Sequence, residues 1–412
     1  MVDWASEYHQ AALRLDDLVA RARLTLCGLS ACVDATCSLH DALPALLGAS
    51  NPQAVAFGEL LLARATAGIG GEVRVDWPDG PDWLDRRLAF RHALGGTGPH
   101  AARVLTHLGA PALLALATRS PEQMAVLEPR MRLAHAGRAI AVADLSPIRP
   151  NVTKIYIFEF TAGRLLGAAR LARSSRIIVR FNDPGLEDDT EFAALSARLA
   201  AQAGAAVLSG YNGIGGGDMR GALTLTRSLI AGWQCHEPLL IHLELAGYDR
   251  AAYRDAVLEG LAGQITSLGL SLSEYEALMP APAPLADGMS ALAQRLGLRR
   301  VCVHADNWAA AVTTGDADRE RQALITGCLL AGGRAASGTV ARPTGAHPDA
   351  QFEAPPAPAA PTGNWQFVCV SAPYLPSPAT TLGLGDTFMA GCLLVLGQGA
   401  SEQDKIERGT SA

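Results

Sequence analysis

The sequence contains almost no lysine. Lys154 and Lys405 are the only lysines among 34 basic residues, and the others are arginines. A phosphate group held by a side chain is therefore expected to be held by arginine, whose planar guanidinium matches the phosphate oxygens. The formal net charge of −6 argues against a nucleic-acid-binding surface.

Two further features are absent from the sequence. The eight cysteines include no C-x-x-C pair and no tight ligand cluster for zinc, so we expect reduced, buried thiols. No apolar run reaches the roughly 18–20 residues that span a bilayer. The apolar run at 24–33 is too short for this, and Asp16 and Asp17 before it do not suit a signal peptide. These absences predict a cytoplasmic protein without a membrane partner.

What the sequence does contain is enough apolar material for a large core. The chain has 412 residues, of which 49% are hydrophobic and 18% are charged. This suits one large domain that carries an excursion or a second small domain. From about residue 186 onward strands and helices alternate, which predicts an α/β fold with a mainly parallel central sheet and helices on both faces. Residues 23–35 read as another buried strand, which ends near Asp34.

Three segments break this pattern. Residues 70–92 and 150–182 contain strands in which apolar and charged residues alternate, and we expect them to form a small separate sheet. Residues 342–363 are rich in proline and alanine, which predicts a long surface loop.

The segment "GLGD" at 383–386 precedes an apolar run near the end of the chain. Taken alone, its glycines make a turn and Asp386 caps the following helix. However, further polar clusters also follow predicted strands, namely Asp34 and residues 209–214, 241–245, 271–276 and 303–307. Because ligands bind beyond the carboxyl ends of the strands in open α/β sheets, these clusters predict a lined cleft.

This combination fits phosphoryl transfer, which requires positioning and charge neutralisation. A glycine-rich loop that opens a helix offers backbone N–H groups to phosphate oxygens. Asp386, directly after it, is placed to accept the proton of an attacking hydroxyl. Glu244 and Glu276, near the ends of two predicted strands, are candidates for holding Mg²⁺, usually through waters.

The motifs resemble, in their order along the chain, those of the ADP-dependent sugar kinases, the glucokinase and phosphofructokinase family of the ribokinase-like superfamily. The segments that carry the resemblance are "CGLSACVDA", "LGGTGPHAA", "IYIFEF", "SSRIIVRF", "SGYNGI", "IHLELAG", "SLGLSLSEYEAL" and "LGLGDTFMAG". The resemblance implies a ribokinase-like α/β kinase domain over residues 1–412, with a β-rich lid inserted at about 70–92 and 150–182. It also implies a phosphotransferase that uses ADP and Mg²⁺ and phosphorylates a hexose or a hexose phosphate.

The resemblance further implies roles for individual residues. They are the catalytic base Asp386, the anion-hole glycines Gly383 and Gly385, the magnesium-organising Glu244 and Glu276, the phosphate-binding Arg176, and the sugar-binding Asp34 and Gly96. Each has a purely structural alternative: Arg176 in a lid salt bridge, Glu244 as a satisfied buried carboxylate, Glu276 at an exposed helix start. Asn212 belongs either to a turn or to the sugar site.

Three serines depart from the family pattern. Ser273 stands where the Asn-x-x-Glu motif begins with asparagine. Ser175, before Arg176, and Ser30, in the first strand, also replace asparagine. Each replacement shortens a polar side chain without removing a charge, so we expect altered metal or sugar affinity rather than loss of chemistry.

The acceptor and the donor remain open at this point. Arg180 or Lys154 would suit a phosphorylated sugar, whereas Glu72, in the first lid strand, favours a neutral hexose such as glucose over fructose 6-phosphate. An ATP-dependent kinase of the wider superfamily is one alternative, because the choice of ADP or ATP depends on the unusual region before "GLGD". A degenerate, non-catalytic nucleotide or sugar sensor is the other. A lid built from the chain's own strands fits a monomer as well as a dimer.

Overall fold

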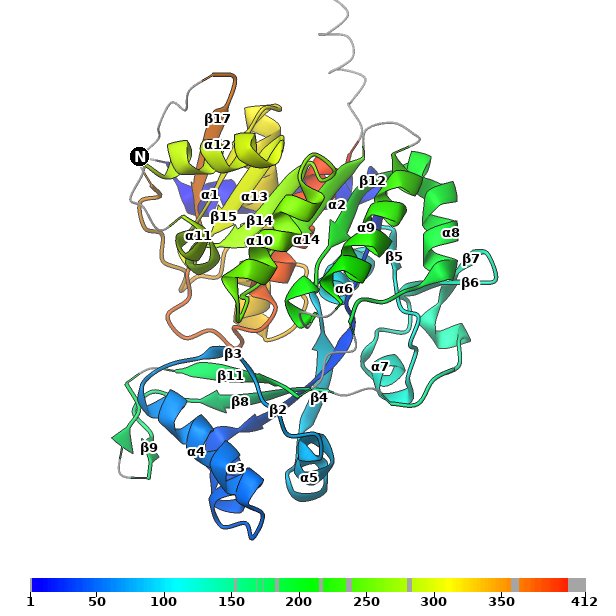
Figure 1. Ribbon diagram of the computed structural model, residues 1–412. Coiled ribbons are helices and arrows are strands. Elements are labelled where there is room, and N and C mark those ends of the chain that lie inside the picture. Colours follow the sequence, from blue (N-terminus) through cyan, green and yellow to red (C-terminus); the bar gives the residue numbers. More distant parts are fainter. Residues whose placement is uncertain are drawn as a thin grey trace, which may run out of the picture.

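Figure 1 presents the computed structural model of the protein, which divides into a large α/β body and a smaller lid. The residues that the structure describes are 2–151, 154–167, 169–172, 174–181, 185–214, 218–234, 239–279, 284–356 and 363–398. Two sheets organise them, one of ten strands in the body and one of five in the lid.

The body sheet has the order β17-β16-β15-β14-β13-β12-β1-β5-β6-β7. The six strands from β15 to β5 are parallel, as are β5 and β6, and antiparallel pairs close both edges. The predicted α/β class with a mainly parallel sheet is therefore confirmed. The strands are β1 (Leu24–Cys27), β5 (Ala112–Leu114), β6 (Arg132–His135), β7 (Arg138–Ala141), β12 (Ala203–Leu208), β13 (Leu240–Glu244), β14 (Ser267–Ser271), β15 (Arg300–His304), β16 (Trp308–Thr313) and β17 (Gln366–Ser371).

Helices cover both faces of this sheet, because side chains alternate between the faces along each strand. Cys27 and Val207 face one core, whereas Leu26 and Leu208 face the other. The first core is covered by α1 (Trp4–Leu13), α2 (Leu15–Ala20), α6 (Thr97–Leu108), α13 (Ala317–Ser337) and α14 (Leu384–Leu396). The second is covered by α8 (Thr190–Leu199), α9 (Met219–Trp233), α10 (Ala251–Leu261), α11 (Leu272–Leu278) and α12 (Leu285–Leu296).

The lid sheet lies below the body in Figure 1 and has the order β3-β11-β8-β2-β4. Its strands are β2 (Cys32–Ser38), β3 (Gly71–Arg74), β4 (Arg91–Gly95), β8 (Ile155–Phe160) and β11 (Ser175–Arg180). Its outer face packs on α3 (Leu39–Leu47), α4 (Pro52–Thr66) and α5 (Gly80–Arg87) through a core that contains Phe57, Trp77 and Phe158. Both segments that were expected to form a small sheet contribute strands to it.

The expectation of one strand over 23–35 is wrong. The chain leaves the body sheet after Cys27 and enters the lid sheet at Cys32. Local apolar periodicity could not reveal this, because both halves are buried, each in a different sheet. Asp34 therefore lies on a lid strand rather than at the end of a body strand.

Short elements complete the fold: α7 (Pro121–Val126), the hairpin β9 (Leu165–Leu166) and β10 (Ala169–Arg170), and the 3-10 turns Val142–Asp144, Ala200–Gln202 and Tyr211–Gly213.

The described part of the proline- and alanine-rich segment, 342–356, contains no helix and a single β-bridge, between Gln351 and Tyr374. Phe352 stacks on Tyr8 of α1 at 5.7 Å between ring centroids. This contact attaches the segment to the body, while residues 357–362 lie outside the described part of the chain.

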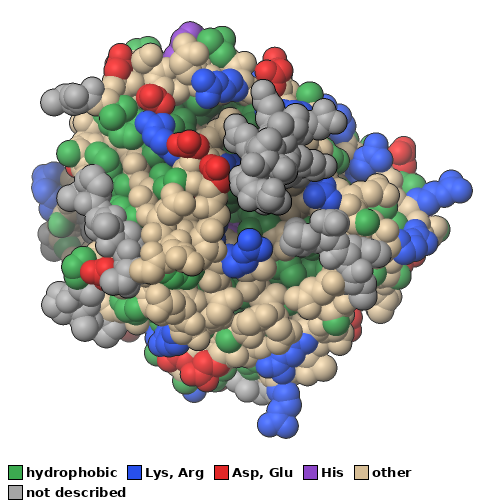
Figure 2. Space-filling model, turned by 90° about the horizontal axis from the view of Figure 1, so that it is seen from above, with side chains coloured by type: hydrophobic (Ala, Val, Ile, Leu, Met, Phe, Trp, Pro, Cys, Tyr) green, Lys and Arg blue, Asp and Glu red, His purple; other side chains and the backbone are tan. Residues whose placement is uncertain are grey.

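On the face of the molecule shown in Figure 2, basic and acidic side chains are interspersed among the described residues. In the described part of the chain, no helix combines the length and the apolar character that crossing a membrane requires.

Candidate active site

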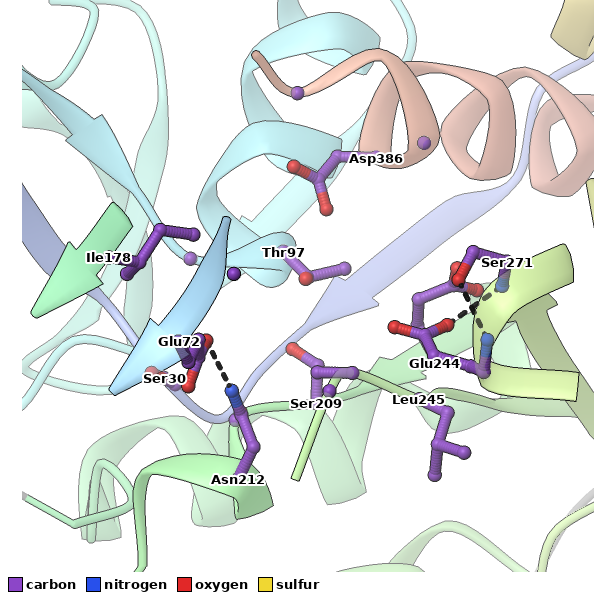
Figure 3. A pocket seen from close by; sticks show the side chains of 18 of the residues that line it. Ser30, Glu72, Thr97, Ile178, Ser209, Asn212, Glu244, Leu245, Ser271 and Asp386 are labelled. Carbon is purple, nitrogen blue, oxygen red and sulfur yellow. Dashed lines mark hydrogen bonds between the residues drawn. The ribbon is translucent and has the colours of Figure 1, made fainter. Parts of the chain in front are cut away.

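A cavity of about 860 Å³ lies between the lid sheet and the body (Figure 3). The parallel strands β13, β14 and β15 end at it with Glu244, Ser271 and His304. Of the residues predicted for the site, the cavity brings together Asp34, Glu72, Gly96, Arg176, Asn212, Glu244, Gly383, Gly385 and Asp386. These residues come from segments far apart in the sequence, so only the folded chain assembles them.

The "GLGD" segment forms the first turn of α14. Gly383 is the N-cap residue with a left-handed φ of +66°, a conformation that glycine adopts without a steric penalty. Asp386 is thus not the cap of the helix. It lies in the first turn, and its carboxylate points into the cavity (Figure 3). The N-terminus of this 13-residue helix presents unpaired N–H groups and the positive end of the helix dipole, an arrangement that suits an anion.

Arg334 is a buried cation behind this turn that sequence reasoning missed. It is 6% exposed and its Nη1 donates to Thr387 Oγ1 at 3.0 Å. Nη1 also lies 3.5 Å from His100 Nδ1. Burial lowers the pKa of His100 to about 4, so this imidazole is neutral beside the guanidinium. A charged residue inside the otherwise apolar stretch of α13 was the one signal that could have pointed to Arg334.

Glu244 is a buried carboxylate that two histidines hold at the cavity. It is 8% exposed, and its Oε2 lies 2.8 Å from His242 Nε2 while its Oε1 lies 3.4 Å from His304 Nε2. Burial alone would raise the pKa of Glu244, but the hydrogen bonds from the two histidines outweigh it and lower the pKa to about 2. Glu244 is therefore a carboxylate at any physiological pH.

The second acidic residue of the site is Glu274 rather than Glu276. Ser271 is the N-cap of α11 and forms a capping box with Glu274: Ser271 N–H donates to Glu274 Oε2 at 2.7 Å, and Glu274 N–H donates to Ser271 Oγ at 3.3 Å. Glu274 lines the cavity beside Glu244, whereas Glu276 is exposed and lines a neighbouring cavity. Residues two apart on a helix point in nearly opposite directions, so the helix start decides which glutamate faces the site. The helix starts after Ser271, so the Ser-x-x-Glu pattern runs from there rather than from Ser273.

These carboxylates fit magnesium better than a transition metal. Among the described residues there is no group of three or more His, Cys, Asp or Glu side chains arranged to hold a metal ion. Mg²⁺ commonly takes only one or two protein carboxylates and completes its shell with waters and substrate phosphates. The carboxylate oxygens of Glu244 and Glu274 are ligands of this kind.

The opposite end of the cavity is built around Glu72. Arg180, from the neighbouring strand β11, donates to both carboxylate oxygens of Glu72, from Nε at 2.9 Å and from Nη2 at 3.2 Å. Asn212 Nδ2 donates to Glu72 Oε1 at 2.8 Å (Figure 3). Glu72 and Arg180 thus largely neutralise each other where they face the cavity.

Asp34 stands on the lid strand β2, which β8 separates from β11. Burial raises the pKa of Asp34 to about 7, and the nearby Arg180 only partly opposes this effect. Gly96 opens α6 with a φ of +93°, and a Cβ at this position would collide with the carbonyl oxygen of Ser30. The chain therefore needs glycine at 96 for the backbone of Ser30 to approach the start of α6 this closely.

A second cavity of about 920 Å³ lies on the other side of the "GLGD" turn. It is lined by apolar and aromatic side chains together with polar groups, among them Leu375, Phe388, Tyr374, Asn307 and Glu353. Leu384 and Gly385 line both cavities, as does Arg176 of the lid. Arg176 Nη1 also donates to Thr381 Oγ1 at 3.1 Å, which links the lid to the turn.

Comparison with solved structures shows the same fold in several kinases. An ADP-dependent kinase in complex with fructose 6-phosphate and ADPβS has 18% sequence identity and a TM-score of 0.79, with 97% of this chain and 99% of that chain covered. The last common ancestor of ADP-dependent phosphofructokinases from Methanosarcinales has 18% identity and a TM-score of 0.76, with 97% and 99% covered. A phosphofructokinase from Pyrococcus horikoshii OT3 with AMP has 16% identity and a TM-score of 0.73, with 94% and 99% covered.

A sequence search of curated proteins finds no match. By contrast, the conserved region of the ADP-specific phosphofructokinase/glucokinase family matches residues 25–395 of the sequence. This match spans both sheets and every segment that contributes to the first cavity. The resemblance to this family noted in the sequence is thereby confirmed, and the chain belongs to the ADP-specific phosphofructokinase/glucokinase family of sugar phosphotransferases.

Proposed function

We propose that this protein transfers the β-phosphoryl group of ADP to a hydroxyl of an uncharged hexose such as glucose, and releases AMP. The observation that carries the proposal is the position of the "GLGD" turn, because Leu384 and Gly385 line both cavities. A nucleoside in the second cavity and a sugar in the first would meet at the N-terminus of α14. The aromatic and apolar walls of the second cavity suit a nucleobase, which buries its flat faces.

Each residue at this meeting point has a part in the transfer. Asp386 takes the proton of the attacking sugar hydroxyl, whose oxygen forms the new bond to the β-phosphorus while the bond from that phosphorus to the AMP oxygen breaks. The N–H groups around Gly383 and Gly385 receive the phosphoryl oxygens. Arg176 offers a guanidinium from the lid to the same phosphate chain.

The proposed transfer would use Mg²⁺ beside this turn. Glu244 and Glu274 would hold Mg²⁺, with waters and the diphosphate completing its shell. When bound, the ion neutralises charge on the nucleotide phosphates. Glu276, the residue first expected in this role, lines the second cavity instead and is not part of the proposal.

The preference for an uncharged acceptor rests on the basic residues near the sugar end. Arg180 is engaged by Glu72, so a sugar phosphate entering here would meet the carboxylate together with the guanidinium. Lys154 does not line the cavity and lies in ion pairs with Asp85 at 2.8 Å and Glu122 at 3.2 Å. A neutral hexose, by contrast, can donate hydroxyl hydrogen bonds to Glu72 and Asp34.

The test is to incubate the purified protein with Mg²⁺ and either ADP or ATP, across glucose, fructose 6-phosphate, ribose and several nucleosides, and to separate AMP, ADP and ATP by chromatography. Glucose-dependent formation of AMP from ADP is expected. Turnover with fructose 6-phosphate but not glucose would overturn the acceptor assignment, and sugar-dependent ADP from ATP alone would overturn the donor. A folded protein that binds nucleotide but turns over no pair would favour the sensor instead.

A further inference from the structure

A continuous line of buried polar side chains crosses the body sheet and ends at Glu244. It runs from Glu320 on α13 through Arg300 on β15, Ser267 on β14 and His242 on β13. All five residues are 8% exposed or less. The sequence indicated only the last part of this line, Glu244 in the polar cluster at 241–245.

The strand register explains why these side chains meet. His242 is the direct partner of Ser267, and Ser267 is the direct partner of Arg300, so the three residues form one row across three parallel strands. Residues two apart on a strand share a face, so Glu244 follows His242 on the same side. Gly269, beside Glu244 on the next strand, leaves the room for this carboxylate, because a Cβ there would overlap its Oε2.

The chemistry of the groups gives the line a direction. Arg300 can only donate, so its Nη1, 3.2 Å from Ser267 Oγ, uses a lone pair of that oxygen. Because the Glu244 carboxylate can only accept, His242 Nε2 carries a hydrogen, and the neutral ring leaves Nδ1 to accept from Ser267 Oγ–H at 2.8 Å. His242 Nδ1 is therefore the acceptor, and its Nε2–H donates to Glu244 Oε2 at 2.8 Å.

The other end of the line is an ion pair. Arg300 Nη2 lies 2.8 Å from Glu320 Oε1, and Arg300 Nε donates to the two oxygens of Glu320 at 2.9 and 3.0 Å. Taking two charges out of water costs free energy that an apolar pair would not cost. The presence of Arg300 in the core would be explained if its charged side chain helps to position a group of the site.

We propose that Ser267 and Arg300 are positioning residues: Arg300 holds the Ser267 hydroxyl, that hydroxyl holds Nδ1 of the His242 ring, and the ring thereby fixes the Glu244 carboxylate at the cavity. With the ring held at Nδ1, the donor to Glu244 Oε2 cannot swing, and Glu244 Oε1 stays directed toward His304. The importance of this orientation for turnover rests on the proposed function, whereas the restraint of the ring itself does not.

The experiment compares Ser267→Ala with Ser290→Ala. Ser290 is a matched control, since it is 2% exposed and its hydroxyl donates to Ala286 O within α12 at 2.7 Å, away from the cavity. Both variants lose one buried hydroxyl, but Ser267→Ala also takes a partner from Arg300 Nη1 and His242 Nδ1, so its melting temperature should fall further. In ¹⁵N-histidine-labelled protein without ligands, Ser267→Ala should shift the His242 Nδ1 resonance toward that of an acceptor nitrogen without a hydrogen bond. Ser290→Ala should leave it unchanged.

Turnover provides the second measurement. Loss of a residue that orients a metal-binding side chain typically lowers activity by about 10- to 100-fold. Such a fall is expected for Ser267→Ala, together with a higher Mg²⁺ concentration for half-maximal rate. Adding His242→Gln to Ser267→Ala should lower the activity by less than the two single effects combined, because both substitutions break the same line of hydrogen bonds.

Several results would overturn the proposal: an unchanged Nδ1 resonance in Ser267→Ala, equal activity losses in the Ser267 and Ser290 variants, or full additivity with His242→Gln. If Ser267→Ala does not fold, Ser267→Cys, which keeps a weaker donor, should move the same resonance in the same direction by less. Should the proposed function fail, the nitrogen resonance still decides whether the ring is held, because it is measured without substrate.

Discussion

The guanidinium of Arg334 lies directly against the backbone of Gly383. A Cβ at Gly383 would stand 2.5 Å from Arg334 Nη2 and 2.6 Å from Nη1. The same Arg334 donates to Thr387, one helical turn further along α14. A buried cation therefore supports the turn that presents Asp386, and any side chain at 383 would displace it.

Replacing Gly383 with alanine is expected to abolish most activity. An L-residue with this positive φ costs roughly 1–2 kcal/mol, and the added methyl group would in addition collide with Arg334. We expect a fall in kcat of at least about 100-fold, the size seen when one anion-hole donor is lost. Gly163→Ala is the matched control for strain, since Gly163 has a φ of +79° but no atom within 4 Å of its Cβ position. Equal losses in both variants would show that contact with Arg334 is irrelevant.

Replacing Asp386 with alanine is expected to separate catalysis from binding. A general base contributes about 100- to 10,000-fold to the rate, so kcat should fall by that factor. Nucleotide affinity, measured by calorimetry, should change little because the second cavity is intact. A variant that retains more than a tenth of wild-type turnover would contradict the role of Asp386 as the base.

Replacing Glu72 with glutamine is expected to change the choice of acceptor. The substitution removes the negative charge that Glu72 places against Arg180, which favours a phosphorylated sugar, and it removes a strong acceptor for hydroxyl groups. We expect kcat/KM for glucose to fall and the ratio of fructose 6-phosphate to glucose use to rise by about tenfold or more, equivalent to about 1.4 kcal/mol. Asp82→Asn removes an exposed ion pair with Arg86 on the outer helix α5 and should leave the ratio unchanged. An unaltered ratio in Glu72→Gln would show that the pair does not select the acceptor.

The raised pKa of Asp34 predicts a pH dependence of sugar binding. Because this pKa is about 7, Asp34 is mostly protonated at pH 6 and mostly ionised at pH 8. The ionised form accepts hydrogen bonds at both oxygens, so the KM for the sugar should fall as the pH rises through 7. Asp34→Asn mimics the protonated form at every pH and should lack this change. The ratio of KM values, variant over wild type, should therefore grow from pH 6 to pH 8, and a constant ratio would contradict the assignment.

Much of the fold and of the site could be predicted from the sequence. Strands and helices each give a local stretch of sequence a characteristic spacing of apolar residues. The alternation of strand and helix patterns after residue 186 therefore indicated the α/β class. The "GLGD" and "HLE" segments are short and continuous, so each can be recognised from a few consecutive residues. Nine of the ten predicted site residues line one cavity, although only the folded chain brings their separate segments together.

Other features depend on which distant elements pack together, and only the tertiary structure decided them. The split of residues 23–35 between two sheets follows from strand pairing, not from apolar content. Glu274 faces the cavity instead of Glu276 because α11 begins after Ser271, and a shift of two residues turns a side chain by about 200° around a helix.

The buried charges illustrate the same limit. Arg334 is an isolated charge in the apolar second half of α13, whereas Arg300 is the second of two adjacent arginines and begins β15. Their roles depend on partners more than 20 residues away in the sequence. Arg334 donates to Thr387, and Arg300 donates to Ser267. The sequence by itself determined the class of fold and the chemical groups available. Long-range packing decided which groups meet, because hydrogen bonds act over about 3 Å while the chain folds residues hundreds of positions apart into contact.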